Sequence, residues 1–283
     1  MIVYLNGSYV EQENAKISVN DRGFLFGDGI YEVIRVVEGK YVLAQEHLTR
    51  MDEGLEALGI NLNSSVRQEM LTIGQELIKK NNLEKGQSSV YIQVTRGAAS
   101  ARSHTFPDPP ISPTVYFSAG LFTPHTQLHQ DGVAVITVPD VRWSRCNLKT
   151  VNLLPNTLAK QRAQDAGVNS AIMIRDGVIT ESPNANIFGV KDGVLYTYPA
   201  THQILNGITR RAVLKIADRL NIPVVLEPIP EHKLFDQDEL FFSGTTTDIQ
   251  PITVVNGKTI GSGKPGAVVR QIQEAYEKLL TTK

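Results

Sequence analysis

Short strands joined by tight turns constrain the fold of this chain more than any other feature. Asn6-Gly7 separates two short apolar segments near the N-terminus, and Asn256-Gly257 separates two more near the C-terminus. Asn and Gly both tolerate the positive φ values that two-residue hairpin turns require. Two further turns lie between segments in which apolar and polar residues alternate, Glu38-Gly39-Lys40 and Lys191-Asp192-Gly193. We therefore expect antiparallel hairpins in both halves of the chain.

Helical patterns lie between these hairpins. Leu48, Met51 and Leu55 recur at helical spacing, which predicts an amphipathic helix over 46–59. Further helices are predicted over 65–81, 152–166 and 209–220, with a last one starting at Pro265. Helices and hairpins in one chain predict a mixed α/β (α+β) fold.

The chain has 283 residues, enough for one large or two medium domains. Apolar periodicity lapses over 121–131, and Pro124 falls within the lapse. We expect this segment to be a linker between a small N-terminal α/β domain, 1–120, and a larger C-terminal domain, 132–283.

Composition excludes several kinds of partner. The formal net charge is −1, which gives no general attraction to nucleic acid or to anionic membranes. No stretch approaches the roughly 20 apolar residues of a membrane span. Cys146 is the one cysteine, so no internal disulfide can form, which suits a reducing compartment. We expect a cytoplasmic protein that acts on small molecules.

Lys149 is a candidate catalytic residue only because three other segments follow it in the sequence. Alone, a lysine after a polar strand is usually a surface residue. Here it is followed by Thr180–Ile187, Leu205–Arg210 and Ser243–Thr246. Together these segments supply what pyridoxal-phosphate chemistry needs: an amine for the imine, a carboxylate for the pyridine nitrogen, and phosphate donors at a helix N-terminus.

The order of these motifs resembles the fold-type IV pyridoxal-phosphate enzymes. The motifs that carry the resemblance are, in order, Arg50 in Glu46-His47-Leu48-Thr49-Arg50, then Lys149, then Thr180-Glu181, then Leu205-Asn206-Gly207-Ile208-Thr209-Arg210. The resemblance extends from Gly7 to Gly266. That family includes branched-chain and D-amino-acid aminotransferases and aminodeoxychorismate lyase. It implies a two-domain enzyme with a small α/β domain and a larger pseudo-barrel domain.

The resemblance implies roles for individual residues around pyridoxal 5'-phosphate. Lys149 is the Schiff-base lysine and the proton shuttle, and Glu181 pairs with the pyridinium nitrogen. Arg50 binds the phosphate, and Leu205 packs on the ring face. The remaining phosphate-side donors are Ile208, Thr209, Thr245 and Thr246.

Arg102-Ser103-His104 resembles the substrate-carboxylate signature of the D-amino-acid aminotransferases. Arg102 and His104 would bind the carboxylate together with Tyr31. In that subfamily the loop reaches the active site of the neighbouring subunit, so a homodimer is implied. Handedness of the substrate follows from this resemblance alone.

The chain departs from the family pattern in two places. Ser182 stands where the family has glycine after Thr-Glu, and Pro183, Asn184 and Ala185 stand where small hydroxyl residues are usual. Gly244 stands where serine is common. These changes leave every essential group in place, but they affect the surroundings of the cofactor.

The implied reaction is D-alanine + 2-oxoglutarate = pyruvate + D-glutamate, by two half-reactions at one site. Three alternatives remain at this point. An L-branched-chain aminotransferase and aminodeoxychorismate lyase share the fold, although the first lacks the trap of Arg102 and His104. A non-catalytic pyridoxal-phosphate-binding protein is the third.

Overall fold

The computed structural model describes residues 1–281, which form two compact units. The first unit comprises Met1–Thr123 and the short segment Leu148–Leu153. The second comprises Pro124–Asn147 and the described residues from Leu154 onward. The range 121–131 predicted as a linker contains the end of one strand and a helix, α4 (Thr126–Asp131).

The first unit is built on a six-stranded antiparallel sheet. Its strand order is β2 (Ser8–Glu11), β1 (Ile2–Leu5), β6 (Thr114–Leu121), β5 (Gln87–Thr95), β3 (Gly29–Val37) and β4 (Lys40–Tyr41). The predicted turns join its hairpins, with Asn6, Gly7, Glu38 and Gly39 at positive φ.

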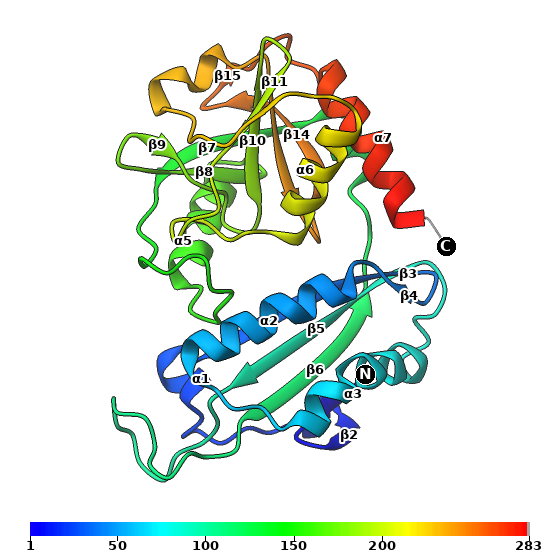
Figure 1. Cartoon of the computed structure of the whole chain (residues 1–283), viewed down its shortest axis with the longest axis vertical. Helices are drawn as coiled ribbons and strands as arrows, with labels where there is room; N and C mark the ends of the chain where they lie inside the picture. The colour runs from blue at the N-terminus through cyan, green and yellow to red at the C-terminus, as the bar shows by residue number, and fades with distance from the viewer. Residues whose placement is uncertain (282–283) are drawn as a thin grey trace. The chain divides into compact units, whose positions relative to one another are not determined.

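Two amphipathic helices cover one face of this sheet. They are α2 (Ala44–Leu58) and α3 (Ser64–Lys80), and α2 runs along the strands in Figure 1. Ile30 and Ile34 of β3 pack with Met51 of α2 and Leu77 of α3 in the core of the unit. Burying each such side chain contributes about 1.5–3 kcal/mol.

The other face of the sheet carries a row of tyrosines. The Tyr31 and Tyr91 rings stack with centroids 5.7 Å apart, and Tyr91 lies 6.2 Å from Tyr116. Residues 31, 91 and 116 alternate with the buried residues of their strands, so their side chains point away from α2 and α3. A short helix, α1 (Arg22–Phe26), precedes β3.

The second unit contains a nine-stranded mixed sheet. Its strands are β12 (Val224–Val225), β11 (Val194–Thr197), β10 (Asn186–Lys191), β13 (Glu239–Gly244), β14 (Asp248–Val255), β7 (Val133–Pro139), β8 (Ser170–Arg175) and β9 (Val178–Ile179), with β15 (Lys258–Thr259) paired to β14. β7 pairs in parallel with both β14 and β8, whereas β13 pairs antiparallel with β10 and β14.

Helices pack on this sheet at several places. α5 (Leu154–Asp165) lies against β7 and β8, and α6 (Ile208–Arg219) packs on β13 and on α7 (Ala267–Thr281) (Figure 1). Glu239 accepts bonds from the Val268 and Val269 N–H groups and so caps α7. None of the helices within residues 1–281 has the length and apolar character needed to cross a bilayer.

The structure differs from the sequence predictions in several local details. The residues Tyr41–Ala44 have the composition of a strand, but Leu43 has φ +52° and the chain turns directly into α2. α7 begins two residues after Pro265. The five-residue α1 and the 3-10 turns at Gln12–Asn14 and Glu231–Asp236 are not predicted, because segments this short show no periodicity.

Candidate active site

Lys149 is held at the edge of the sheet of the first unit. The Tyr31 N–H donates to the Lys149 carbonyl at 3.0 Å, and the Val151 N–H donates to the Gly29 carbonyl at 3.0 Å. This backbone pairing fixes the segment against the start of β3. The Lys149 Nζ lies 4.2 Å from the centroid of the Tyr31 ring. The structure therefore brings two of the predicted residues together.

Arg50 is fixed by a buried carboxylate that the sequence did not indicate. Its Nε and Nη2 donate to the two oxygens of Glu32, each at 2.7 Å. The His47 ring nitrogen lies 2.7 Å from the same carboxylate. Burial would raise the pKa of Glu32, but Arg50 and His47 outweigh it and lower the pKa to about 2. Among residues 1–281, no partner is found for Nη1 of Arg50, which leaves that nitrogen for a ligand.

Glu181 is a buried carboxylate with three donors. The Asn186 Nδ2 donates to its Oε1 at 2.7 Å, the Leu205 N–H donates to the same oxygen at 2.9 Å, and Arg142 donates to Oε2. Burial raises the pKa of Glu181, whereas Arg142 and the Leu205 N–H favour the ionised form. A carboxylate in this setting is directed and desolvated, as a partner of a cationic ring nitrogen must be.

Arg142 joins Glu181 to a second buried carboxylate, Asp140. Its Nε and Nη2 donate to Asp140 at 2.9 and 2.8 Å. Asp140 also accepts from Arg175 at 3.0 Å and from the Thr180 hydroxyl at 2.7 Å. Burial opposes ionisation of Asp140, but Arg142 and the Thr180 hydroxyl lower its pKa to about 2. The sequence prediction does not include this network, and its only signal in the sequence is the spacing of Asp140 and Arg142, two residues apart.

The predicted phosphate donors lie at two places in the second unit. Ile208 and Thr209 begin α6, whose N-cap, Gly207, provides no side-chain bond. The Thr209 hydroxyl lies 3.4 Å from that of Tyr276. Thr245 and Thr246 form the turn between β13 and β14.

Gly207 has no room for a side chain. A Cβ there would lie 2.2 Å from Oδ1 of Asn186, whose Nδ2 donates to Glu181 and, at 2.7 Å, to the Leu205 carbonyl. The glycine therefore lets the start of α6 approach the residue that orients Glu181.

Arg102 and His104 are exposed and lie on one aromatic ring. The Arg102 guanidinium lies 4.9 Å from the centroid of Phe26, and the His104 ring lies 5.5 Å from it. Among the residues described, neither side chain bonds to or stacks on Tyr31 or Lys149. Within one chain, the three predicted carboxylate-binding residues are thus not assembled.

The segment that departs from the family pattern forms a closed turn. The Ser182 hydroxyl accepts from the Ala185 N–H at 2.9 Å and from the Asn184 N–H at 3.3 Å. The Pro183 carbonyl accepts from Asn156 at 2.8 Å. At Gly244, a Cβ would lie 3.3 Å from that of Ala185. The unusual residues therefore fit one another.

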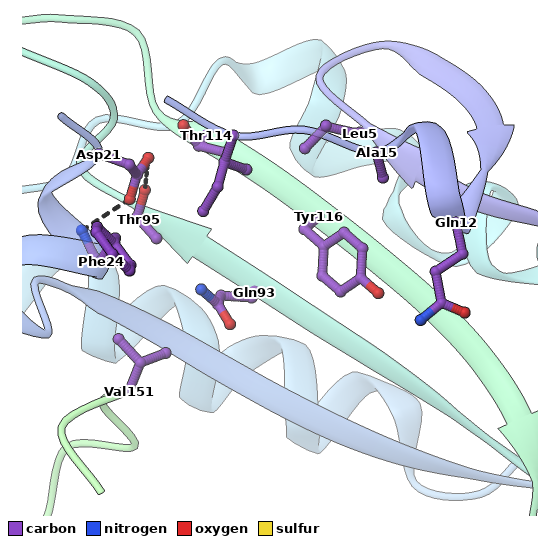
Figure 2. A pocket seen from close by; sticks show the side chains of 12 residues that line it. Leu5, Gln12, Ala15, Asp21, Phe24, Gln93, Thr95, Thr114, Tyr116 and Val151 are labelled. Atoms are coloured by element: carbon purple, nitrogen blue, oxygen red, sulfur yellow. Dashed lines mark hydrogen bonds between the residues drawn. The ribbon is translucent and has the colours of Figure 1, made fainter. Parts of the chain in front are cut away.

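A cavity of about 440 Å³ lies on the open side of the sheet of the first unit. Figure 2 shows Gln93 and Tyr116 from neighbouring strands in its wall, with Phe24 and Val151 beside them. None of the predicted site residues lines it, although Val151 is two positions beyond Lys149.

Comparison with known proteins identifies the family. A family model described as Amino-transferase class IV matches residues 29–255, well over half of the chain. The chain belongs to the class IV aminotransferase family. The enzyme class predicted from the sequence, an aminotransferase, is thereby confirmed.

Individual relatives agree with this assignment over nearly their whole length. The D-alanine aminotransferase of Staphylococcus epidermidis is 41% identical over 279 residues, covering 98% of this chain and 97% of the relative. That of Bacillus licheniformis is 37% identical over 277 residues, covering 98% and 96%.

Solved structures show the same fold. The branched-chain amino acid aminotransferase of Escherichia coli has a TM-score of 0.91 at 27% identity, covering 99% of this chain and 94% of that one. The branched-chain aminotransferase of Thermoproteus uzoniensis, solved with norvaline, has a TM-score of 0.88 at 27% identity, covering 100% and 96%. Another branched-chain amino acid aminotransferase, solved with pyridoxamine 5'-phosphate, has a TM-score of 0.89 at 26% identity. The predicted fold-type IV class is confirmed.

Proposed function

We propose that this class IV aminotransferase transfers the amino group of a D-amino acid such as D-alanine to a 2-oxo acid such as 2-oxoglutarate. The observation that carries the proposal is the full-length similarity to D-alanine aminotransferases, at 41% identity in one case. The motif Arg102-Ser103-His104 supports the same substrate class.

The residues present fit pyridoxal 5'-phosphate. Glu181 is a buried carboxylate aimed by three donors, which suits a pyridinium nitrogen. Ser243, paired in register with Asn186, has a buried hydroxyl that lacks a partner among residues 1–281. The start of α6 offers N–H groups that no side chain caps. Each of these groups either lacks a hydrogen-bond partner among the described residues or is oriented so that it can bind a ligand.

Several residues would hold the cofactor. Glu181 would keep the ring nitrogen protonated, and Leu205 would pack on the ring. The N–H groups of Ile208 and Thr209, the Thr209 hydroxyl, Thr245, Thr246 and Nη1 of Arg50 would bind the phosphate. The Glu32 carboxylate holds Arg50 in one orientation for this purpose.

When bound, the protonated ring withdraws electrons from the substrate Cα and so makes its proton removable. Lys149 would carry the cofactor. As a free amine, it would take the proton from the substrate Cα and pass it to the cofactor. The Tyr31 ring face, 4.2 Å from Nζ, restricts where that amine lies. The edge pairing of Lys149 with β3 fixes the origin of the side chain.

The substrate carboxylate would be bound by Arg102 and His104 of one subunit together with Tyr31 of the other. The proposed assembly is therefore a homodimer. Exposed apolar side chains support an interface on the first unit: Val19 is 73% exposed, Phe24 69% and Ile17 51%. Phe24 and Ile17 also line the cavity of the first unit, and Phe24 is labelled in Figure 2. The proposed location is the cytoplasm, supported by a single buried cysteine, Cys146.

Mixing two impaired variants tests the shared site, at a substrate concentration too low for Arg102→Ala to turn over. Lys149→Ala and Arg102→Ala dimers are dissociated together and reassociated. Half of the dimers are then mixed, and each carries one complete site, so about a quarter of the wild-type activity returns. No return of activity from reassociated dimers would place the whole site in one subunit.

A chiral comparison tests the substrate. With 2-oxoglutarate as acceptor, the initial rate with D-alanine should far exceed that with L-leucine. The reverse order would favour an L-branched-chain aminotransferase, because this chain resembles solved branched-chain aminotransferases in fold. Pyruvate release from aminodeoxychorismate without an acceptor would favour the lyase.

A further inference from the structure

A buried arginine of α1 holds the backbone of the loop that carries Arg102 and His104. Arg22 is 3% exposed, and its Nη1 donates to the carbonyl of Ser103 at 2.6 Å and to that of Thr105 at 3.2 Å. These two residues flank His104, and Ser103 follows Arg102. Bonds from a charged donor to carbonyls are stronger than neutral ones. They fix the chain on both sides of His104.

Asp28 holds Arg22 in place. Its Oδ2 accepts from Nε of Arg22 at 2.9 Å and from Nε of Arg96 at 2.8 Å. Arg96 also donates to the carbonyls of Leu58 and Gly59, at 2.7 and 3.0 Å, where α2 ends. Burial opposes ionisation of Asp28, but Arg96 and Arg22 keep its pKa below the usual value. We call Arg22, Asp28 and Arg96 the loop clamp.

The side chains of the loop share a surface with the loop clamp. The centroid of the Phe26 ring lies 4.7 Å from the Arg22 guanidinium, 4.9 Å from that of Arg102 and 5.5 Å from the centroid of the His104 ring. An aromatic face attracts a guanidinium and limits its directions. Phe26 therefore supports both carboxylate-binding side chains from one position.

We propose that Arg22 is a positioning residue for the substrate carboxylate, acting through the Ser103 and Thr105 carbonyls and the Phe26 ring to place Arg102 and His104. The inference rests on the proposed function, in which Arg102 and His104 bind that carboxylate. Arg22 is committed to Asp28 and two carbonyls, so it acts on binding and leaves the proton transfer at Lys149 unchanged.

The kinetic consequence is specific. Both the amino acid and the 2-oxo acid present a carboxylate to the same trap, so the KM values of both substrates change together. A displacement of about 1 Å in a positioning group lowers the efficiency of a reaction by up to about 100-fold. We therefore expect Arg22→Gln to raise both KM values by about 10- to 100-fold, with kcat changed less than about threefold.

Arg22→Lys is the conservative variant. One ammonium cannot reproduce the planar fork that serves Asp28 and two carbonyls, so its KM values should be intermediate. Phe26→Leu removes the shared ring but keeps the polar bonds of the loop clamp, and it should also raise both KM values. Arg67→Gln is the matched control, because Arg67 pairs with Asp52 at a partly exposed place in the same unit. It should leave both KM values unchanged.

A second measurement does not depend on activity. Limited digestion of the holoenzyme with trypsin, read by mass spectrometry at the Arg102–Ser103 bond, should be faster in Arg22→Gln than in wild type or Arg67→Gln. If Arg22 contributed only to overall stability, Arg22→Gln would instead be cleaved faster throughout the chain.

The outcomes separate the two proposals. If Arg102→Ala raises both KM values while folded Arg22→Lys and Phe26→Leu leave them at the wild-type level, the positioning role is wrong and the proposed function stands. If Arg102→Ala itself has wild-type KM values, the proposed substrate site is wrong.

Discussion

Replacing Arg142 by methionine should destabilise the second unit strongly and lower activity. Arg142 donates twice to Asp140, once to Glu181, and at 3.3 Å to the Gln203 carbonyl. Methionine keeps much of the apolar length of the side chain but none of the donors. Asp140 keeps Arg175 and Thr180 as partners, so the largest loss falls on Glu181.

The magnitude follows from the burial of both partners. The side chains of Arg142 and Glu181 are 7% and 6% exposed. Breaking a buried ion pair by removing one partner costs about 3–5 kcal/mol. For a unit of this size, each kcal/mol lowers Tm by about 2–4 °C, so we expect a fall of roughly 6–20 °C. Without Arg142 the pKa of Glu181 should rise further, which makes the carboxylate a weaker partner for a protonated ring nitrogen.

The assay is thermal unfolding of the cofactor-free protein, with Arg67→Met as the control. Arg67 and Asp52 are 26% and 47% exposed, so that variant should lose only about 0–1 kcal/mol. The double variant Arg142→Met with Glu181→Gln should recover part of the loss, because a neutral amide needs no cation. A fall in Tm no larger than that of Arg67→Met would show that the buried pair of Arg142 and Glu181 contributes little to stability.

Three further predictions concern Glu32, Arg50 and Gly207. The pKa of Glu32 is lowered from 4.5 to about 2. The ionised carboxylate therefore contributes about 3 kcal/mol of stability above pH 4.5, and this contribution is lost as the pH falls through about 2. Acid should lower the Tm of wild type more steeply than that of Glu32→Gln. Arg50→Lys removes the bidentate pair with Glu32. It should raise the Kd for pyridoxal 5'-phosphate, measured by equilibrium titration, about 10- to 100-fold. An unchanged Kd would exclude Arg50 from the phosphate site. Gly207→Ala must displace Asn186 and should weaken cofactor binding in the same titration, whereas unaltered affinity would show that α6 can shift freely.

Local features of the fold were predictable because their causes are local. Asn6-Gly7 and Asp192-Gly193 adopt positive φ values, which these residue types tolerate wherever they stand in a chain, so their turns were visible in the sequence. α2 and α3 bury one apolar stripe each, and their periodicity located both to within two residues.

The polar networks were not predictable, because they join residues far apart in the chain. Arg142 meets Glu181 across 39 positions, and Arg22 meets Ser103 across 81. No periodicity reports such a pairing. Glu32 lies in a strand whose other inward residues are apolar, and only the structure shows that it faces His47 and Arg50 of α2.

The roles of Lys149 and of the D-amino acid substrate are tested together by one measurement. Wild-type holoenzyme is mixed with D-alanine without any 2-oxo acid, and pyruvate and cofactor absorbance are followed in a single turnover. We expect one pyruvate per site with a matching change in absorbance, a much slower response to L-leucine, and no pyruvate from Lys149→Ala. Pyruvate formation by Lys149→Ala at the wild-type rate would exclude Lys149 as the catalytic residue, and a faster response to L-leucine than to D-alanine would exclude the proposed substrate.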